Sequence, residues 1–189
     1  GSSRGLGDVY KRQSNDLVNW KLIGHGLHRE DQCNGDMNLV DVQSDGGIHA
    51  PTIRYHKGTF YIITTNVYNS GDGKPGLMRN FVITAKDPSG PWSEPHIIEG
   101  APGIDPDIFF DTDGKVYFTG THSPGDMNAN GIGEIWIQEL DIKKWKLTGD
   151  RKTVWDGVFG CCTEGPHIYK EHGLCLLYTS PSPRDDPLS

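Results

Sequence analysis

The sequence lacks the features that usually identify membrane proteins, helical proteins and nucleic-acid binders. No apolar run approaches the roughly 20 residues that a membrane span requires, and the mean hydropathy of −0.54 favours a soluble protein. A 3.6-residue periodicity appears nowhere over a useful length. Lys and Arg number 18 against 25 Asp and Glu, a formal net charge of −7. Without a basic stripe, we expect neither nucleic acid nor a membrane as a partner.

Cysteine is also scarce, and glycine and proline are abundant. The chain has four cysteines, Cys33, Cys161, Cys162 and Cys175, and their spacing is not that of a metal site. Adjacent cysteines rarely pair with each other, because disulfide geometry is hard to reach across one peptide bond. A reduced compartment therefore fits better than a disulfide framework. The 25 glycines and 12 prolines indicate many tight turns.

The two ends of the chain differ from the rest. Residues 1–13 (GSSRGLGDVYKRQ) and 175–189 (beginning CLLYTSPSPRD) resemble translated sequencing-adapter sequence at the ends of metagenomic reading frames. We therefore exclude both from functional reasoning; the alternative is a disordered native tail at each end. We expect residues 14–174 to be a partial catalytic domain that begins and ends mid-domain. The true N-terminus would then be missing, so a targeting signal cannot be used to decide between a cytoplasmic and a secreted bacterial protein.

A strand signature occurs three times in the middle of the chain. It begins at Pro51 (PTIRYHKGTFYIITT), Pro106 (PDIFFDTDGKVYFTGT) and Pro166 (PHIYKEHG). Each stretch is typical of a strand, a tight Gly turn and a second strand, with β-branched and aromatic residues on the arms. The repeat step is 106 − 51 = 55 and then 166 − 106 = 60 residues.

A second motif alternates with the first. It is a polar turn that leads into a tryptophan, at Asp16–Trp20, Asp87–Trp92 and Asp141–Trp145. Strand-like segments precede its second and third copies, at residues 81–85 and 135–140. One repeat unit therefore contains four strands.

Four antiparallel strands repeated every 50 to 60 residues predict an all-β protein, a β-propeller of four-stranded blades. The alternative is a two-sheet sandwich, which does not explain the same signature at every fourth strand. We expect about three blades' worth of structure. It comprises the outer strand of one blade (20–25), two whole blades (48–98 and 104–156) and the inner strand of a fourth (164–170).

This topology brings three strand starts to one face, which we call the top. His49, Asp105 and Glu164 would converge there near the central axis, at equivalent strand starts, and the loops 66–80 and 122–134 would surround them. Two carboxylates held apart on a rigid scaffold can divide acid and base roles. Glycoside hydrolysis requires such a division. The alternative is that each carboxylate caps a turn by binding backbone N–H groups.

Three stretches together resemble a known family. GIHAPTIRYHKGTFYIITTN, GIDPDIFFDTDGKVYFTGT and TEGPHIYK are similar to the pattern of glycoside hydrolase family 43. These enzymes are five-bladed β-propellers that act mainly as β-xylosidases, α-L-arabinofuranosidases and endo-arabinanases. The resemblance covers essentially all of residues 14–174. It implies an inverting glycoside hydrolase that acts on xylosides or arabinosides of plant cell-wall polysaccharides, as in xylan degradation.

The resemblance also implies roles for single residues. Asp105 matches the aspartate that modulates the pKa of the acid and orients the substrate, and Glu164 matches the general acid. A third carboxylate activates the attacking water, and acid and base stand roughly 6.5–9.5 Å apart in inverting enzymes. That base would open the first inner strand, before Ser14, and nothing in residues 1–13 matches it. We expect this chain alone to be inactive.

Substrate contacts are expected from five residues. His49 stands where one family pattern has an aromatic residue; it either bonds a sugar hydroxyl or is a strand-end histidine bonded to backbone. Asn66, Arg79 and Asn80 flank a top loop and offer the amide and guanidinium groups that sugar sites use, although loop polarity explains them equally. Phe159 could form a wall near the acid.

Other candidates are better explained by structure. The three repeat-equivalent tryptophans are expected to pack blades rather than bind sugar: Trp20, Trp92 and Trp145. Residues 111–114 (DTDG) begin like a calcium loop, but an Asp-Gly turn explains them, and the histidines do not suggest a zinc site. We expect no metal among the site residues and no required cofactor, although the resemblance permits a central calcium ion.

Two rival functions remain open. One is a non-catalytic carbohydrate-binding propeller, and the other is a propeller that binds protein partners. The Asp105 and Glu164 pair favours the enzyme, with an oligosaccharide or polysaccharide as partner. The sequence does not decide between xylose and arabinose, between exo and endo action, or among oligomeric states.

Overall fold

The computed structural model describes residues 10–35, 46–68, 77–122, 133–156 and 163–180. Nearly all regular structure in these ranges is β-strand, as predicted, and the one helix is a short 3-10 turn, η1 (Gln32–Gly35). Consequently, within the described ranges, no helix has the length and apolar character needed to cross a membrane. The chain divides into two compact units, residues 1–97 and 98–189. Each unit is described by itself.

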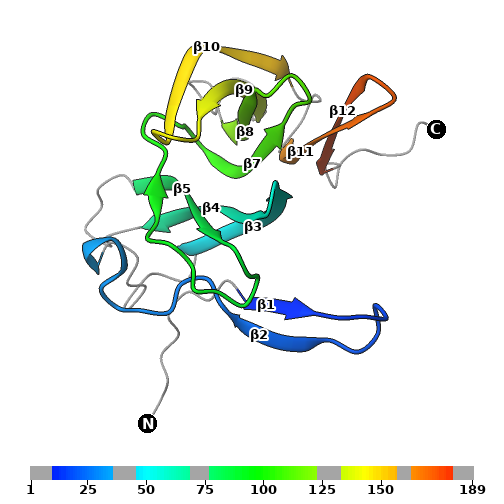
Figure 1. Ribbon diagram of the computed structural model, residues 1–189. Coiled ribbons are helices and arrows are strands. Elements are labelled where there is room, and N and C mark those ends of the chain that lie inside the picture. The colour runs from blue at the N-terminus through cyan, green and yellow to red at the C-terminus, as the bar shows by residue number, and fades with distance from the viewer. Residues whose placement is uncertain (1–9, 36–45, 69–76, 123–132, 157–162, 181–189) are drawn as a thin grey trace, which may run out of the picture. The chain divides into compact units, whose positions relative to one another are not determined.

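The first unit contains a hairpin and a four-stranded sheet (Figure 1). In the hairpin, β1 (Tyr10–Gln13) pairs antiparallel with β2 (Lys21–His25). The sheet is an antiparallel meander of β3 (Gly47–His56), β4 (Thr59–Tyr68), β5 (Leu77–Ala85) and β6 (His96–Ile97). Lys57 and Gly58 both have positive φ at the β3–β4 turn, the conformation of a two-residue hairpin loop.

The second unit repeats this arrangement. Its sheet is a meander of β7 (Ile104–Phe110), β8 (Val116–His122), β9 (Glu134–Asp141) and β10 (Lys146–Trp155). A further hairpin pairs β11 (Glu164–Glu171) with β12 (Leu174–Ser180). The four-stranded units predicted from the sequence are therefore confirmed. The predicted bounds 48–98 and 104–156 match the two sheets, 47–97 and 104–155, to within one residue.

The central strands carry the core of each unit. In the first unit a buried apolar cluster is centred on β4 and β5 and includes Ile62, Phe81 and Trp92. In the second unit Phe118 on β8 and Trp136 on β9 are fully buried, with ring centroids 5.5 Å apart. Burial of such side chains stabilises each sheet by roughly 1.5–3 kcal/mol per residue. These cores hold the innermost strands, β3 and β7, in place.

The innermost strands begin with the same irregularity. The ladder register shifts just after His49 in β3, after Ile104 in β7 and after Glu164 in β11. In each bulge the residue before the proline has a positive φ, 43° at Ala50, 55° at Asp105 and 60° at Gly165. Asp105 is thus equivalent to Ala50 and Gly165. The predicted equivalence of the two strand starts is confirmed, but Asp105 lies within its bulge, one residue nearer the proline than Glu164.

The polar turns before the tryptophans are held by aspartates. The Asp16 carboxylate accepts the N–H groups of Val18 and Asn19 at 2.9 and 2.7 Å, and Asp141 accepts that of Lys143 at 2.9 Å. Asp87 accepts the N–H of Ser89 at 2.8 Å. Side-chain bonds of this kind fix turns locally. The repeated motif in the sequence is therefore a repeated turn.

The three tryptophans differ in burial. Trp92 is 4% exposed and belongs to the core of the first unit, as predicted, and Trp145 is partly buried. Trp20 is 52% exposed, so the prediction that it packs a blade was wrong. Its indole N–H instead donates to the carbonyl of Leu17 at 3.1 Å, within the β1–β2 hairpin. The hairpin offers Trp20 a local partner but no apolar sheet face.

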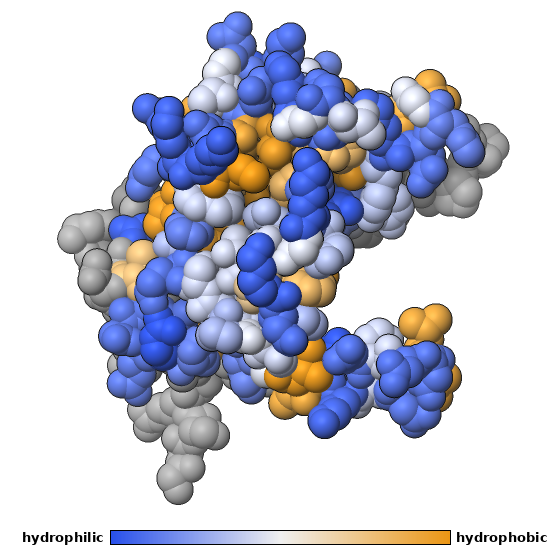
Figure 2. Space-filling view, viewed as in Figure 1, coloured by the Kyte–Doolittle hydropathy of each residue, from blue (hydrophilic) through white to orange (hydrophobic). Residues whose placement is uncertain are grey.

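Two strands include residues of the segments that resemble adapter sequence. The β1–β2 hairpin ends in Leu17 and Val18, which are 81% and 77% exposed, and hydrophobic atoms are visible at its tip in Figure 2. On β12, Leu174 and Tyr178 are 67% and 60% exposed. The side chains of β12 therefore contribute little to the core of the second unit, whereas Lys11 of β1 is 6% exposed. The adapter origin of these ends stays a prediction.

Candidate active site

Glu164 and Asp105 are brought together in the second unit. Glu164 opens β11, where its side chain is exposed, and Asp105 lies partly buried in the bulge of β7. The Asp105 carboxylate accepts the backbone N–H of Gly165 at 3.1 Å. The residue that follows Glu164 is therefore fixed to Asp105 directly. This contact confirms that the two strand starts converge.

Two effects raise the pKa of Glu164 above its ordinary value. The larger is the loss of water around the carboxyl group, and the second is the negative charge of Asp105. Both disfavour the ionised form. Glu164 therefore tends to keep its proton beside a second carboxyl group, which is the condition for a general acid.

A series of side-chain contacts joins β11 to the β7–β10 sheet. The Thr121 hydroxyl donates to the carbonyl of Thr163 at 2.7 Å. Asp107, fully buried on β7, accepts the N–H of Ile168 at 3.4 Å and lies 3.4 Å from Nδ1 of His167. Further along, the Lys170 ammonium pairs with the Asp111 carboxylate. These contacts place the acid relative to β7.

Asp107 was missed by the sequence analysis. Its signal is the second carboxylate of the DPD stretch, which falls inside a strand that is otherwise apolar. A charged side chain at a buried strand position calls for donors on a neighbouring element. Those donors lie on a strand about 60 residues further along the sequence, so a local pattern does not reveal them.

The chain matches a known family along almost its whole length. The model of the family described as "Glycosyl hydrolases family 43" matches residues 2–185. The chain belongs to glycosyl hydrolase family 43. This membership confirms the resemblance that the three strand stretches indicated.

Curated relatives of this family 43 chain are about three times longer than the matching segment. It is 46% identical over 169 residues to a xylosidase/arabinosidase of Butyrivibrio fibrisolvens, covering 86% of this chain and 30% of the relative. It is 38% identical over 172 residues to a xylan 1,3-beta-xylosidase of Vibrio sp, covering 91% of this chain and 31% of the relative. The chain thus spans about a third of the length of these relatives.

Solved structures of family 43 share the fold. A GH43_12 protein from the capybara gut metagenome matches with a TM-score of 0.76 and 32% identity, covering 93% of this chain and 33% of that chain. A xylan beta-1,4-xylosidase from Bacillus halodurans matches with a TM-score of 0.71 and 29% identity, covering 95% of this chain and 37% of that chain. The predicted fold class is confirmed: the family 43 chain is a partial β-propeller.

The predicted substrate residues of the first unit lie at one end of its sheet. In the ladder, His49 on β3 faces Thr65 on β4, and Thr65 faces Asn80 on β5. Asn66 pairs with Arg79 across the same two strands. The placement of these residues on adjacent strands follows from the regular register. Phe159 lies outside the described residues.

The two asparagines are buried in strands, not exposed in a loop. Asn66 is 3% exposed and Asn80 is 2% exposed, and the side-chain amide oxygen Oδ1 of Asn80 accepts the Thr65 hydroxyl at 2.7 Å. The two asparagines flank the β4–β5 connection, as expected, but β4 and β5 extend two to three residues past them into the range assigned to the loop. His49 is partly buried, and its carbonyl accepts the Thr64 hydroxyl at 2.6 Å. Sugar contacts by these residues stay predictions.

Metal sites are absent from the described part of this family 43 chain. No group of three or more His, Cys, Asp or Glu side chains there is arranged to hold an ion. The stretch that begins like a calcium loop forms the β7–β8 turn, where Asp113 accepts the N–H of Lys115 at 2.9 Å. The Asp-Gly turn is thus confirmed. A calcium ion elsewhere in the propeller stays a prediction.

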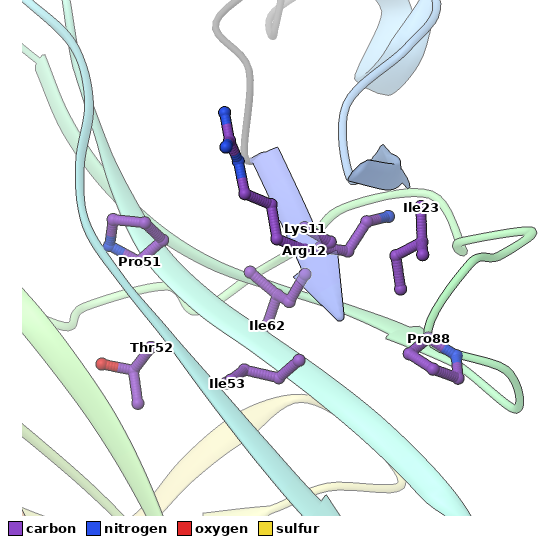
Figure 3. Close-up of a pocket in the computed structure, with 8 residues that line it drawn as sticks. All are labelled: Lys11, Arg12, Ile23, Pro51, Thr52, Ile53, Ile62 and Pro88. Atoms are coloured by element: carbon purple, nitrogen blue, oxygen red, sulfur yellow. The ribbon is translucent and has the colours of Figure 1, made fainter. Parts of the chain in front are cut away.

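A cavity in the first unit contains none of the predicted site residues. It measures about 210 Å³ and lies between the β1–β2 hairpin and strands β3 and β4 (Figure 3). Its lining is largely apolar and consists of Lys11, Arg12, Ile23, Pro51, Thr52, Ile53, Ile62 and Pro88. Lys11 and Arg12 enter it from the segment that resembles adapter sequence. We therefore assign it no role in the family 43 site.

Proposed function

We propose that this chain supplies the general acid of an inverting glycoside hydrolase that acts on xylosides and arabinosides of plant cell-wall polysaccharides. The observation that carries the proposal is the hydrogen bond from the Gly165 backbone N–H to the Asp105 carboxylate, next to Glu164. The negative charge of Asp105 also raises the pKa of Glu164. The relatives named xylosidase/arabinosidase and xylan 1,3-beta-xylosidase support the substrate class. Either an oligosaccharide or a polysaccharide would fit this class.

In the proposed reaction, Glu164 donates its proton to the oxygen of the leaving sugar. The raised pKa keeps that proton in place until the glycosidic bond breaks, and Asp105 holds the start of β11 throughout. Water attacks the anomeric carbon from the opposite face after a third carboxylate removes its proton. The proton transfers need side chains and water only. The third carboxylate has no assigned residue in this chain.

The first test replaces Glu164 by glutamine, which keeps the shape of the side chain but has no proton to donate. Because the chain spans about a third of its relatives, residues 14–174 are exchanged into the Butyrivibrio fibrisolvens enzyme, which supplies the remaining blades. We expect Glu164→Gln in this chimera to lower kcat by about 10²–10⁴-fold on an oligosaccharide such as xylotriose, whose leaving sugar must be protonated. In the unsubstituted chimera, kcat should fall at high pH, as Glu164 loses its proton.

The matched control is Glu171→Gln, an exposed glutamate at the far end of the same strand. It makes the same chemical change away from Asp105, so kcat should stay within about twofold of the unsubstituted chimera. Full activity of the Glu164→Gln chimera would remove Glu164 as the acid. Sugar binding without turnover by the folded, unsubstituted chimera would favour the carbohydrate-binding alternative.

A further inference from the structure

Strands β7 and β11 meet without a shared backbone ladder. They belong to different sheets, in which β7 pairs with β8 and β11 pairs with β12. The bonds between them are made by side chains of β7 and of Asp111 just after it, and the bonded residues differ by 59, 60 or 61 in number. A nearly constant difference means that the two strands run parallel and in register. Residues of β7 therefore contact residues about 60 positions later on β11, which is the repeat step found in the sequence.

Asp107 occupies the middle of this contact. Its side chain is fully buried, and its carboxylate accepts the N–H groups of Ile108 at 2.8 Å and Ile168 at 3.4 Å. Nδ1 of His167 lies 3.4 Å from the same carboxylate. A buried carboxylate is strongly destabilising unless donors surround it. A shift of β11 along β7 would remove two of these three groups, so Asp107 penalises any other register.

The start of β11 is bonded to the second unit's sheet at Thr163 and Gly165, but its own hairpin ladder is irregular there. Its ladder with β12 is interrupted between Glu164 and His167, where Gly165 adopts a positive φ. Glu164 therefore lies beyond the bulge from the regular part of its hairpin. The residues that follow the bulge, His167 and Ile168, are the two that Asp107 holds.

We propose that Asp107 is a positioning residue that sets the register of β11 on β7 through His167 and Ile168 and so holds Glu164 beside Asp105. The inference rests on the proposed function, since it assigns Asp107 a part in placing the proposed acid. Asp107 itself is buried and does not touch substrate in this assignment. Its loss should lower kcat more than it raises KM.

The first experiment measures position on this 189-residue chain and needs no activity. The carboxyl carbon of Glu164 is followed by NMR as pH is changed, in the parent chain and in Asp107→Asn and His167→Ala. Because desolvation and Asp105 raise the pKa of Glu164, a displaced β11 should lower that pKa measurably. His167→Ala keeps the Asp107 charge, so a shift there reports position and not a lost charge.

The control for the titration is Asp113→Asn, which removes one negative charge from the exposed β7–β8 turn. It should leave the Glu164 pKa unchanged. If Asp107→Asn does not fold, His167→Ala tests the same contact from β11. In His167→Ala the Asp107 carboxylate still accepts the backbone N–H groups of Ile108 and Ile168. An unchanged Glu164 pKa in a folded Asp107→Asn or His167→Ala chain would overturn the proposal.

The second experiment measures kcat and KM in the chimera. We expect Asp107→Asn to lower kcat roughly tenfold or more, because small displacements of a catalytic group are costly, with KM changed less than about threefold. A loss confined to KM, or to the amount of folded protein, would contradict a positioning role. The two proposals fail separately. If the chimera shows no turnover, the hydrolase proposal is rejected. The titration of Glu164 in the 189-residue chain still decides whether Asp107 is a positioning residue.

Discussion

Lys11 is the described residue whose surroundings suit it least. It is 6% exposed, its ammonium lies 4.5 Å from the centre of the Trp92 ring, and its Nζ has no hydrogen-bond partner. Burial lowers its pKa from 10.5 to about 8. Its cation–π contact offsets only about 0.5–2 kcal/mol of the desolvation cost. Such a conflict between a residue and its surroundings lowers the stability of the folded chain.

Replacing Lys11 by methionine should stabilise the chain. Methionine fills similar space without a charge to desolvate, and we expect a gain on the order of 1–3 kcal/mol at pH 7. The folded-state pKa lies below the unfolded one, so the cost of Lys11 is fully present below pH 8 and fades as pH rises to 10.5. Urea unfolding at pH 7 and above pH 10 measures this difference, and an equal gain at both pH values would contradict the explanation.

Among the strands, β7 depends on a glycine at its entry. Gly103 has a φ of 74°, and a Cβ there would lie 1.8 Å from the carbonyl oxygen of Thr121 on β8. The first ladder pair of these strands, Ile104 with Thr121, is next to it. The close approach of the two backbones, rather than the turn itself, requires glycine.

Substituting Gly103 by alanine should therefore separate β7 from β8. We expect a loss of roughly 3 kcal/mol or more of unfolding free energy, from the forced backbone shift and the left-handed conformation together. Gly114→Ala is the matched control, since its φ is 90° but nothing lies within 4 Å of a Cβ. It should cost only about 1–2 kcal/mol. Equal losses for the two variants in thermal unfolding would contradict a steric role for Gly103.

The strands could be predicted because their signals are local. Alternating β-branched and aromatic residues, Gly turns and the aspartate turns all act within a few residues, so the four-stranded units were correct. The bulges were not foreseen, because a one-residue register shift leaves no distinct pattern, and this displaced Asp105 by one position. Burial of Asn66 and exposure of Trp20 depend on neighbours from other elements. Asp107 depends on β11, some 60 residues away.

For the whole chain, the decisive quantity is the number of carboxyl groups that the reaction needs. An inverting hydrolase uses an acid and a base on opposite faces of the sugar, and the described residues supply a proposed acid with its partner, Glu164 and Asp105. The chain spans about 30% of the Butyrivibrio fibrisolvens relative. A raised pKa at Glu164 favours its protonated form but does not activate water.

We therefore predict that the isolated chain does not hydrolyse an oligosaccharide such as xylotriose, whereas the chimera does. The isolated chain should still have the raised pKa of Glu164, because desolvation and Asp105 both act within the second unit. Turnover is followed by release of reducing sugar at equal protein concentrations, with Glu164→Gln as the background for each protein. Turnover by the isolated chain that Glu164→Gln abolishes would mean that a carboxylate within these 189 residues serves as the base. The acid and the base would then both lie within residues 1–97 and 98–189, the two compact units of this chain.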